Sequence, residues 1–101
     1  MAADQPPLSF LGRPLPASFE RRVVILGPGD ALVYDPAEWR DAIIVVEAGQ
    51  IELECRDGSR QYFGRGDILW LDGLPLRALH NPGPNLAVLT AVSRRDSSSS
   101  G

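Results

Sequence analysis

The chain has 101 residues, enough for one small domain with a modest core. Apolar residues make up 44% and charged residues 23%, as in ordinary soluble proteins, and the net charge of −3 provides no clustered basic surface for DNA or RNA. The single cysteine, Cys55, excludes an internal disulfide and a multi-cysteine metal site. No apolar run reaches membrane-spanning length and no signal peptide is visible. The expected location is therefore the cytoplasm.

Residues 1–21 are predicted to form an extended N-terminal arm. Four prolines lie among its apolar side chains, and proline cannot donate a hydrogen bond to a strand ladder. The apolar side chains need a surface to cover, and they are Leu8, Phe10, Leu11 and Leu15. Two interpretations stay open: the arm packs on its own domain, or it crosses to a partner subunit.

Residues 22–93 are predicted to form a small all-β domain without a convincing helix. Short runs rich in β-branched residues are separated by Gly and Pro turns at intervals typical of a sandwich or barrel. The polar residues 35–41 between two of these runs predict a loop, or at most one helical turn. The predicted strands, in chain order, are residues 22–26, 31–34, 42–48, 51–55, 60–63, 68–71, 76–81 and 86–93.

Two strands carry the clearest patterns. Residues 42–48 (AIIVVEA) are the most hydrophobic run and predict a buried strand. Residues 51–55 (IELEC) alternate apolar and acidic side chains, which predicts a half-buried strand with Glu52 and Glu54 on a solvated face. The dipeptide Asp57-Gly58 then predicts a hairpin.

The last residues, 94–101, contain no apolar side chain and predict a disordered tail.

The stretches VVEAGQIEL (45–53) and FGRGDILWLDGLPLRALHNPG (63–83) resemble the two sequence motifs of the cupin superfamily. Gly29 and Gly49 match the ends of the first motif, while Gly66 and Asn81 match the start and end of the second. The glycines mark tight corners and are specific for the fold rather than for an activity. The resemblance implies a cupin-type double-stranded β-helix, a jelly-roll barrel, and a homodimer, because dimers are common in that family.

The metal ligands that the resemblance implies are absent. In cupins the first motif carries a His-x-His pair and a Glu, and the second carries another His. These positions fall at residues 35–38, which contain no histidine, at Ala42 and at Arg77. Neither alanine nor arginine offers a lone pair to a metal ion. The resemblance therefore implies a cupin without the usual metal and without a cofactor.

Arg77 and Asn81 are predicted to point into the barrel. Strand alternation, anchored to the inward-facing histidine of the resembling family, sends these two side chains to the interior and His80 outward. A guanidinium inside a barrel keeps its proton and needs an anionic partner.

Two interpretations of Arg77 stay open. In the first, the guanidinium reaches solvent at the barrel mouth or pairs internally with Asp35, Glu38 or Asp41. In the second, it binds a carboxylate or phosphate of a small ligand, which the amide of Asn81 helps to orient.

Other side chains are candidates to line a cavity. Trp39 is predicted either to cover the barrel mouth or to lie in a subunit contact, and Trp70 to pack in the core. The candidate ligand-binding residues are Arg77, Asn81, Trp39, Tyr34, Glu38, Asp41 and Trp70. They suggest a module that holds a small, anionic metabolite in its barrel.

The alternative function is a metal-independent isomerase, epimerase or cyclase, and the sequence does not decide whether the protein is catalytic. Such an enzyme needs a residue that transfers protons inside the cavity. The candidates are His80, Tyr34 and Glu38. A histidine at the surface would remove most of the support for this alternative.

Overall fold

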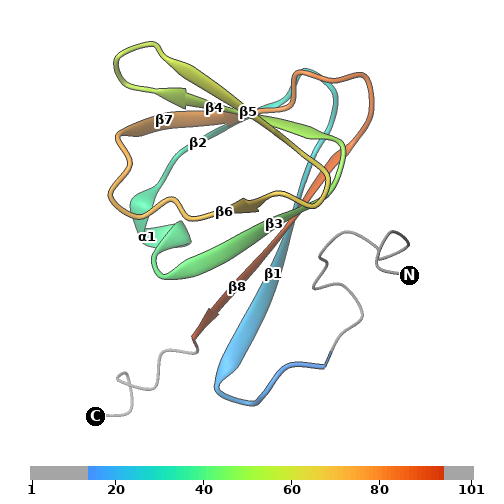
Figure 1. The fold of residues 1–101 in the computed structure, drawn as a ribbon, viewed down its shortest axis with the longest axis vertical. Coiled ribbons are helices and arrows are strands. Elements are labelled where there is room, and N and C mark those ends of the chain that lie inside the picture. Colours follow the sequence, from blue (N-terminus) through green and yellow to red (C-terminus); the bar gives the residue numbers. More distant parts are fainter. Residues whose placement is uncertain (1–13, 95–101) are drawn as a thin grey trace, which may run out of the picture.

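The computed structural model describes residues 14–94 of the chain (Figure 1). Within that part the chain forms eight strands and one short helix, which confirms the all-β expectation. Their bounds are β1 Phe19–Leu26, β2 Ala31–Val33, α1 Pro36–Trp39, β3 Ala42–Ala48, β4 Gln50–Cys55, β5 Arg60–Gly64, β6 Ile68–Leu69, β7 Leu76–His80 and β8 Ala87–Arg94. Most of the predicted arm and tail, residues 1–13 and 95–101, lies outside the described residues.

The strands form two four-stranded antiparallel sheets that face each other (Figure 1). Sheet A has the strand order β1-β8-β3-β6, and sheet B has the order β2-β7-β4-β5. Most neighbours are distant in the sequence, since β1 pairs with β8 over all eight residues and β2 pairs with β7. The core lies between the sheets and is built from the inner faces of both.

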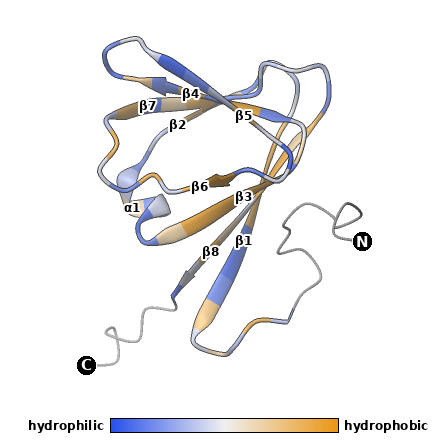
Figure 2. Cartoon of the chain, viewed as in Figure 1, coloured by the Kyte–Doolittle hydropathy of each residue, from blue (hydrophilic) through white to orange (hydrophobic). Residues whose placement is uncertain are grey.

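Strand β3 is apolar on both faces from Ala42 to Val46, which accounts for its hydrophobic run before Glu47 (Figure 2). Ile44 and Val46 point into the core between the sheets. Ile43 and Val45 alternate with them and therefore lie on the outer face of sheet A. Sheet A thus presents apolar side chains on the side that faces away from sheet B.

The turn between β3 and β4 carries the chain from sheet A to sheet B and requires glycine. Gly49 has φ +76°, a conformation that L side chains rarely adopt. A Cβ at this position would lie 2.4 Å from the carbonyl oxygen of Leu86 and 2.9 Å from Cα of Ala87. The glycine therefore permits both the backbone turn and the close approach of the segment that leads into β8.

The Asp57-Gly58 hairpin between β4 and β5 is confirmed. The strands pair from Gln50 opposite Gly64 to Glu54 opposite Arg60. Gly58 has φ +89°, and the Asp57 carboxylate accepts hydrogen bonds from the backbone N–H and the hydroxyl of Ser59.

A bulge in β7 changes the direction of the side chains in this strand. Glu54 of β4 pairs with Ala78 of β7, and the next residue of β4, Cys55, pairs with Leu76. Arg77 of β7 therefore has no partner in β4 and is the extra residue of the bulge. Leu76 and Leu79 both enter the core although they are three positions apart. Simple alternation along β7 therefore fails at Arg77.

Seven of the eight strands differ from the predicted bounds by one to three residues, and only β3 matches them at both ends. Strand β1 begins at Phe19 rather than at residue 22, and Arg94 belongs to β8 rather than to the tail, because these two residues pair with each other. The segment 35–41 contains the single helical turn α1, in which the N–H of Ala37 donates to the Asp35 carboxylate that caps the helix. No helix within residues 14–94 is long and apolar enough to cross a membrane.

Candidate functional site

The interior of the barrel is filled by the chain's own side chains. Seven large apolar residues of the core have at most 2% of their surface exposed, and they are Trp39, Ile44, Ile51, Leu53, Leu71, Leu79 and Leu89. They come from both sheets, from α1 and from the segment between β6 and β7. The expected position of a ligand between the sheets is therefore occupied by packed side chains.

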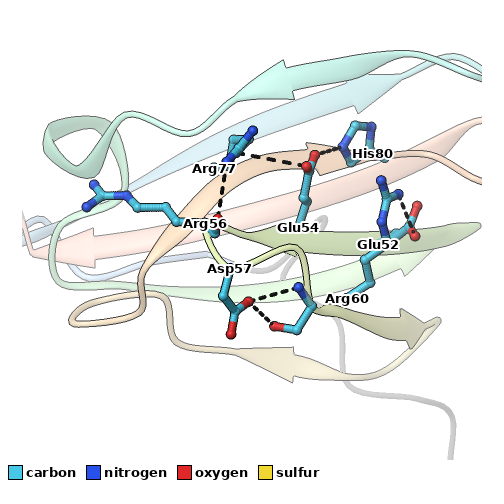
Figure 3. Close-up of polar contacts among 8 residues, drawn as sticks. Glu52, Glu54, Arg56, Asp57, Arg60, Arg77 and His80 are labelled. Atoms are coloured by element: carbon cyan, nitrogen blue, oxygen red, sulfur yellow. Dashed lines mark hydrogen bonds and ion pairs between the residues drawn. The ribbon is translucent and has the colours of Figure 1, made fainter.

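The expectation that Arg77 points into the barrel is wrong. Its side chain is 60% exposed, with Nε 3.9 Å from a carboxylate oxygen of Glu54 and a terminal nitrogen donating to the carbonyl oxygen of Arg56 at 3.1 Å (Figure 3). The cause is the β7 bulge, which turns this one residue to the outer face of sheet B. Its partner is Glu54 and not one of the acids in residues 35–41.

Asn81 is buried as expected, but its side chain holds backbone rather than facing a cavity. Its exposed fraction is 1%. The amide nitrogen donates to the carbonyl oxygens of Leu26 and Asn85 at 3.0 and 2.7 Å, and the amide oxygen accepts from the N–H of Gly83 at 3.0 Å. Both donor hydrogens are used in these contacts, so this amide has none left to orient a ligand.

Trp39 is a core residue at the end of the barrel, which agrees with the first of its two predicted positions, a cover of the barrel mouth. Its ring is fully buried and belongs to the core cluster. The Arg22 guanidinium lies 4.6 Å from the ring centroid, a cation–π contact. The same guanidinium donates to the Glu38 carbonyl oxygen at 3.1 Å and lies 3.9 Å from the Glu38 carboxylate. Trp39 and Arg22 thus close the end of the barrel at α1.

Tyr34 lies at the edge of the core and points toward the chain between β6 and β7. Its hydroxyl donates to the Leu71 carbonyl oxygen at 3.4 Å. Burial raises the pKa of Tyr34, and the nearby carboxylates of Asp72 and Asp35 raise it further. Burial and the two carboxylates therefore both favour the protonated form of the hydroxyl.

The interior does not fit the metal ion that many proteins of the resembling family hold. The side chains that fill it are apolar, whereas first-row metals need imidazole, carboxylate or thiolate donors. Within residues 14–94, no three His, Cys, Asp or Glu side chains converge to hold an ion. His80, the one histidine, lies on the outer face of sheet B, as strand alternation predicts.

The outer face of sheet B carries a network of charged side chains (Figure 3). His80 Nε2 lies 2.8 Å from Glu54 Oε1, and this hydrogen bond holds the pKa of Glu54 below its usual value. Arg60 donates to the Glu52 carboxylate at 2.9 Å. Hydrogen bonds from Arg60 and then from Tyr62 lower the pKa of Glu52.

The prediction of a solvated acidic face on β4 is wrong. The side chain of Glu52 is 8% exposed and that of Glu54 is 17% exposed. The reason is that β5 and β7 flank β4 and bring Arg60 and His80 over the two carboxylates. This network is internally paired and is consistent with a structural role.

A groove on the outer face of sheet A has the size of a small-ligand site. Its volume is about 420 Å³. Its walls come from β1, β3, β8 and the chain that follows β6, and the lining residues are Phe19, Asp41, Ile43, Trp70, Val92, Ser93 and Arg94. We call this the sheet A groove. It combines an apolar floor with an acid, a hydroxyl and a guanidinium.

Two of the predicted site residues, Asp41 and Trp70, meet in the sheet A groove. Trp70 is 51% exposed, so the expectation that it packs in the core is wrong. It follows β6 on the outer face because Leu69 and Leu71 on either side of it enter the core. Asp41 has φ +56°, and its N–H is held by the Asp72 carboxylate at 2.9 Å.

The remaining five predicted site residues do not line the groove. Sequence reasoning missed the other five lining residues. Ile43, Val92 and Ser93 lie on predicted strands but were not site candidates, whereas Phe19 and Arg94 were assigned to the arm and to the tail. No alternation marks Phe19, because three charged residues, Glu20, Arg21 and Arg22, separate it from the apolar part of β1. No local signal marks Arg94, whose position follows from its pairing with β1.

Comparison with solved structures confirms the resemblance at the level of the fold. The chain is similar to the Cupin_2 domain of an XRE family transcriptional regulator from Enterobacter cloacae, with a TM-score of 0.58 and 22% identity, over 74% of this chain and 79% of that one. The protein therefore has the cupin fold. No protein-family model and no curated protein matches the sequence.

A weaker similarity is found to the regulatory subunit of a cAMP-independent protein kinase A from Trypanosoma brucei. The TM-score is 0.47 and the identity is 18%, over 74% of this chain and 30% of that chain.

Proposed function

We propose that this cupin-fold protein is a non-catalytic binding module that holds a small anionic metabolite with an apolar body. The proposed site is the sheet A groove rather than the barrel interior. The observation that carries the proposal is the groove's lining, in which an exposed indole and strand side chains lie beside one guanidinium. The filled core is the reason for moving the site outward.

Each end of such a ligand has a counterpart in the groove. The Trp70 ring, 51% exposed, offers a flat apolar surface that a ligand would cover. Arg94 can form two parallel hydrogen bonds to a carboxylate or phosphate. No ion pair among residues 14–94 involves Arg94, so within that part its charge is not already neutralised. Asp41, on the groove wall, disfavours ligands with several negative charges.

The alternative enzyme function finds less support. None of the three proton-transfer candidates lines the groove. His80 is bonded to Glu54, Tyr34 donates to a backbone carbonyl, and Glu38 lies beside Arg22. A general acid or base must reach the substrate within hydrogen-bond distance, and these side chains face other protein groups.

The test compares a charged and a neutral ligand with the same apolar body. In calorimetric titrations, we expect phenylacetate to bind about 10-fold or more tightly than phenylacetamide, because a hydrogen bond to a charged group contributes about 1.5–3 kcal/mol. Trp70→Ala should weaken both ligands. Arg94→Gln should remove the preference for phenylacetate.

The matched control is Arg56→Gln, which removes an exposed guanidinium from the hairpin of sheet B. It should leave both affinities unchanged. Equal affinity for the two ligands, or the same loss in both arginine variants, would contradict the proposal.

A further inference from the structure

The sheet A groove carries two opposite charges that do not form an ion pair with each other. Asp41 lies on its wall directly before β3, and Arg94 is the last residue of β8. Both residues are exposed. No ion pair among residues 14–94 involves either of them. A ligand that enters the groove therefore meets a carboxylate and a guanidinium that are both available to it.

The strand register places these two charges next to each other. Ala42 of β3 pairs with Ser93 of β8. Asp41 and Arg94 each lie one position beyond this pair, on neighbouring segments of the chain. Neighbouring strands of a sheet are about 4.8 Å apart. Two charged groups that are one strand spacing apart can contact two substituents on a single carbon atom of a ligand.

The negative charge of Asp41 is not required by the local backbone. Asp41 has φ +56°, a left-handed conformation that aspartate and asparagine both tolerate. Its N–H donates to the Asp72 carboxylate at 2.9 Å. Its own carboxylate has no hydrogen-bond partner among residues 14–94. Asparagine would serve this turn as well, so the structure leaves the charge itself to a ligand.

The end of the groove at Asp41 is electronegative. The carboxylate of Asp72 lies directly behind the backbone of Asp41, so two negative charges are close together there. Such a pair attracts a cation and repels an anion. Arg94 provides the opposite charge on the neighbouring strand. The groove thus suits a ligand that carries a positive group beside its negative one.

Aromatic side chains form the apolar part of the groove. Trp70 is 51% exposed, and Phe19, which pairs with Arg94, lies on the opposite side of the groove. Between them the floor contains Ile43, two positions after Asp41. Aromatic rings interact favourably in offset-stacked and edge-to-face arrangements, beyond the burial of their area. An aromatic ring is therefore the apolar group that this lining fits best.

We propose that the ligand of the sheet A groove is an α-amino acid with an aromatic side chain. Arg94 binds its carboxylate, Asp41 binds its ammonium group and Trp70 covers its ring. This inference rests on the proposed function, to which it adds the positive group of the ligand. A zwitterion satisfies both charges of the groove, whereas a simple anion leaves Asp41 facing a second negative charge.

The test uses three ligands with the same phenylethyl body. Phenylalanine carries both charges, 3-phenylpropionate lacks the ammonium group, and phenethylamine lacks the carboxylate. In calorimetric titrations of the full chain at neutral pH, phenylalanine should bind about 10-fold or more tightly than either of the other two. The reason is that one hydrogen bond to a charged group changes an affinity by about this factor or more.

Two variants assign the charges to their partners. Asp41→Asn should remove the preference for phenylalanine over 3-phenylpropionate by weakening phenylalanine alone, and asparagine keeps the left-handed backbone. Arg94→Gln should weaken phenylalanine and 3-phenylpropionate and leave phenethylamine unchanged. If Asp41 instead serves only to pair with Arg94, its removal frees the guanidinium and strengthens both carboxylates, which would overturn the inference.

The matched control is Glu20→Gln, which removes a negative charge from β1. Glu20 follows Phe19, and strand alternation sends its side chain to the other face of the sheet, so it does not line the groove. All three affinities should stay at their wild-type values. The same loss of phenylalanine binding in Glu20→Gln and Asp41→Asn would show a general effect of charge and would also overturn the inference.

The results separate this inference from the proposed function. If 3-phenylpropionate binds and depends on Arg94, while phenylalanine binds no more tightly, then the inference fails and the proposed function stands. If neither carboxylate binds the wild type more tightly than it binds Arg94→Gln, the proposed function fails and the inference fails with it.

Discussion

Asn81 is a single buried amide that fixes three segments of backbone. It joins the end of β1 to the loop that leads into β8 through the carbonyl oxygens of Leu26 and Asn85. It also accepts from the N–H of Gly83, which shapes the turn after β7. The resembling family places an asparagine at this point of its second motif. In this chain the side chain of Asn81 has a structural role, because its amide binds backbone groups of three segments.

We expect Asn81→Ala to destabilise the protein by about 2 kcal/mol, because two backbone carbonyls lose their donors. Urea unfolding should show a lower midpoint with an unchanged slope. Asn85→Ala is the control, since the side chain of Asn85 is exposed and only its backbone oxygen is used. A wild-type midpoint for Asn81→Ala would show that the amide contacts are not required.

Turns and bulges decide how the strands of this fold present their side chains. The bulge in β7 places Arg77 outside and Leu76 inside, opposite to the result of simple alternation. The glycine turn between β3 and β4 fixes where the chain leaves sheet A for sheet B. Both features act on whole strands, although each involves one residue.

Two glycines allow the contribution of the β3–β4 turn to be measured. Gly49 and Gly58 both have positive φ, but an added Cβ would meet backbone only at Gly49. Gly58→Ala should cost about 1 kcal/mol for the backbone conformation alone. Gly49→Ala should cost about 1–3 kcal/mol more, because it also forces the Leu86 segment away. Thermal unfolding of both variants measures the difference, and equal losses would contradict the predicted clash.

The paired carboxylates of sheet B give the whole molecule an expected sensitivity to acid. Hydrogen bonds from His80, from Arg60 and from Ser59 lower the pKa values of Glu54, Glu52 and Asp57, respectively. A lowered folded-state pKa means that the unfolded chain binds more protons over this range. These carboxylates contribute fully to the free energy of unfolding at pH values above the pKa of a carboxylate in the unfolded chain. The contribution is lost as the pH falls through their lower pKa values in the folded protein.

We therefore expect the free energy of unfolding to decrease as the pH falls below about 4.5, the range in which free glutamates titrate. Denaturant unfolding between pH 3 and 7 measures this dependence. The double variant Glu52→Gln, Glu54→Gln should be less stable than the wild type at pH 7 and should show a flatter pH profile. A profile with the wild-type slope would exclude these two carboxylates as its source.

Local patterns in the sequence were sufficient to predict the existence of the eight strands, the main turns and the fold class. These features depend on local patterns: the alternation of β4, the hydrophobic run of β3, and glycines at Gly49 and Gly58 where the backbone needs positive φ. The arrangement of glycines was also enough for the resemblance to the cupin fold, which the structural comparison confirms. The ligand-binding role of the seven predicted residues stays a prediction.

Which side chains meet depends on contacts between distant segments and could not be predicted from local patterns. The register between β4 and β7 brings Glu54 to His80, although 26 positions separate them. The pairing of β1 with β8 adds Phe19 and Arg94 to the groove of Trp70. Local sequence does not encode such contacts, because strand register and bulges are set by packing between segments that are far apart in the chain.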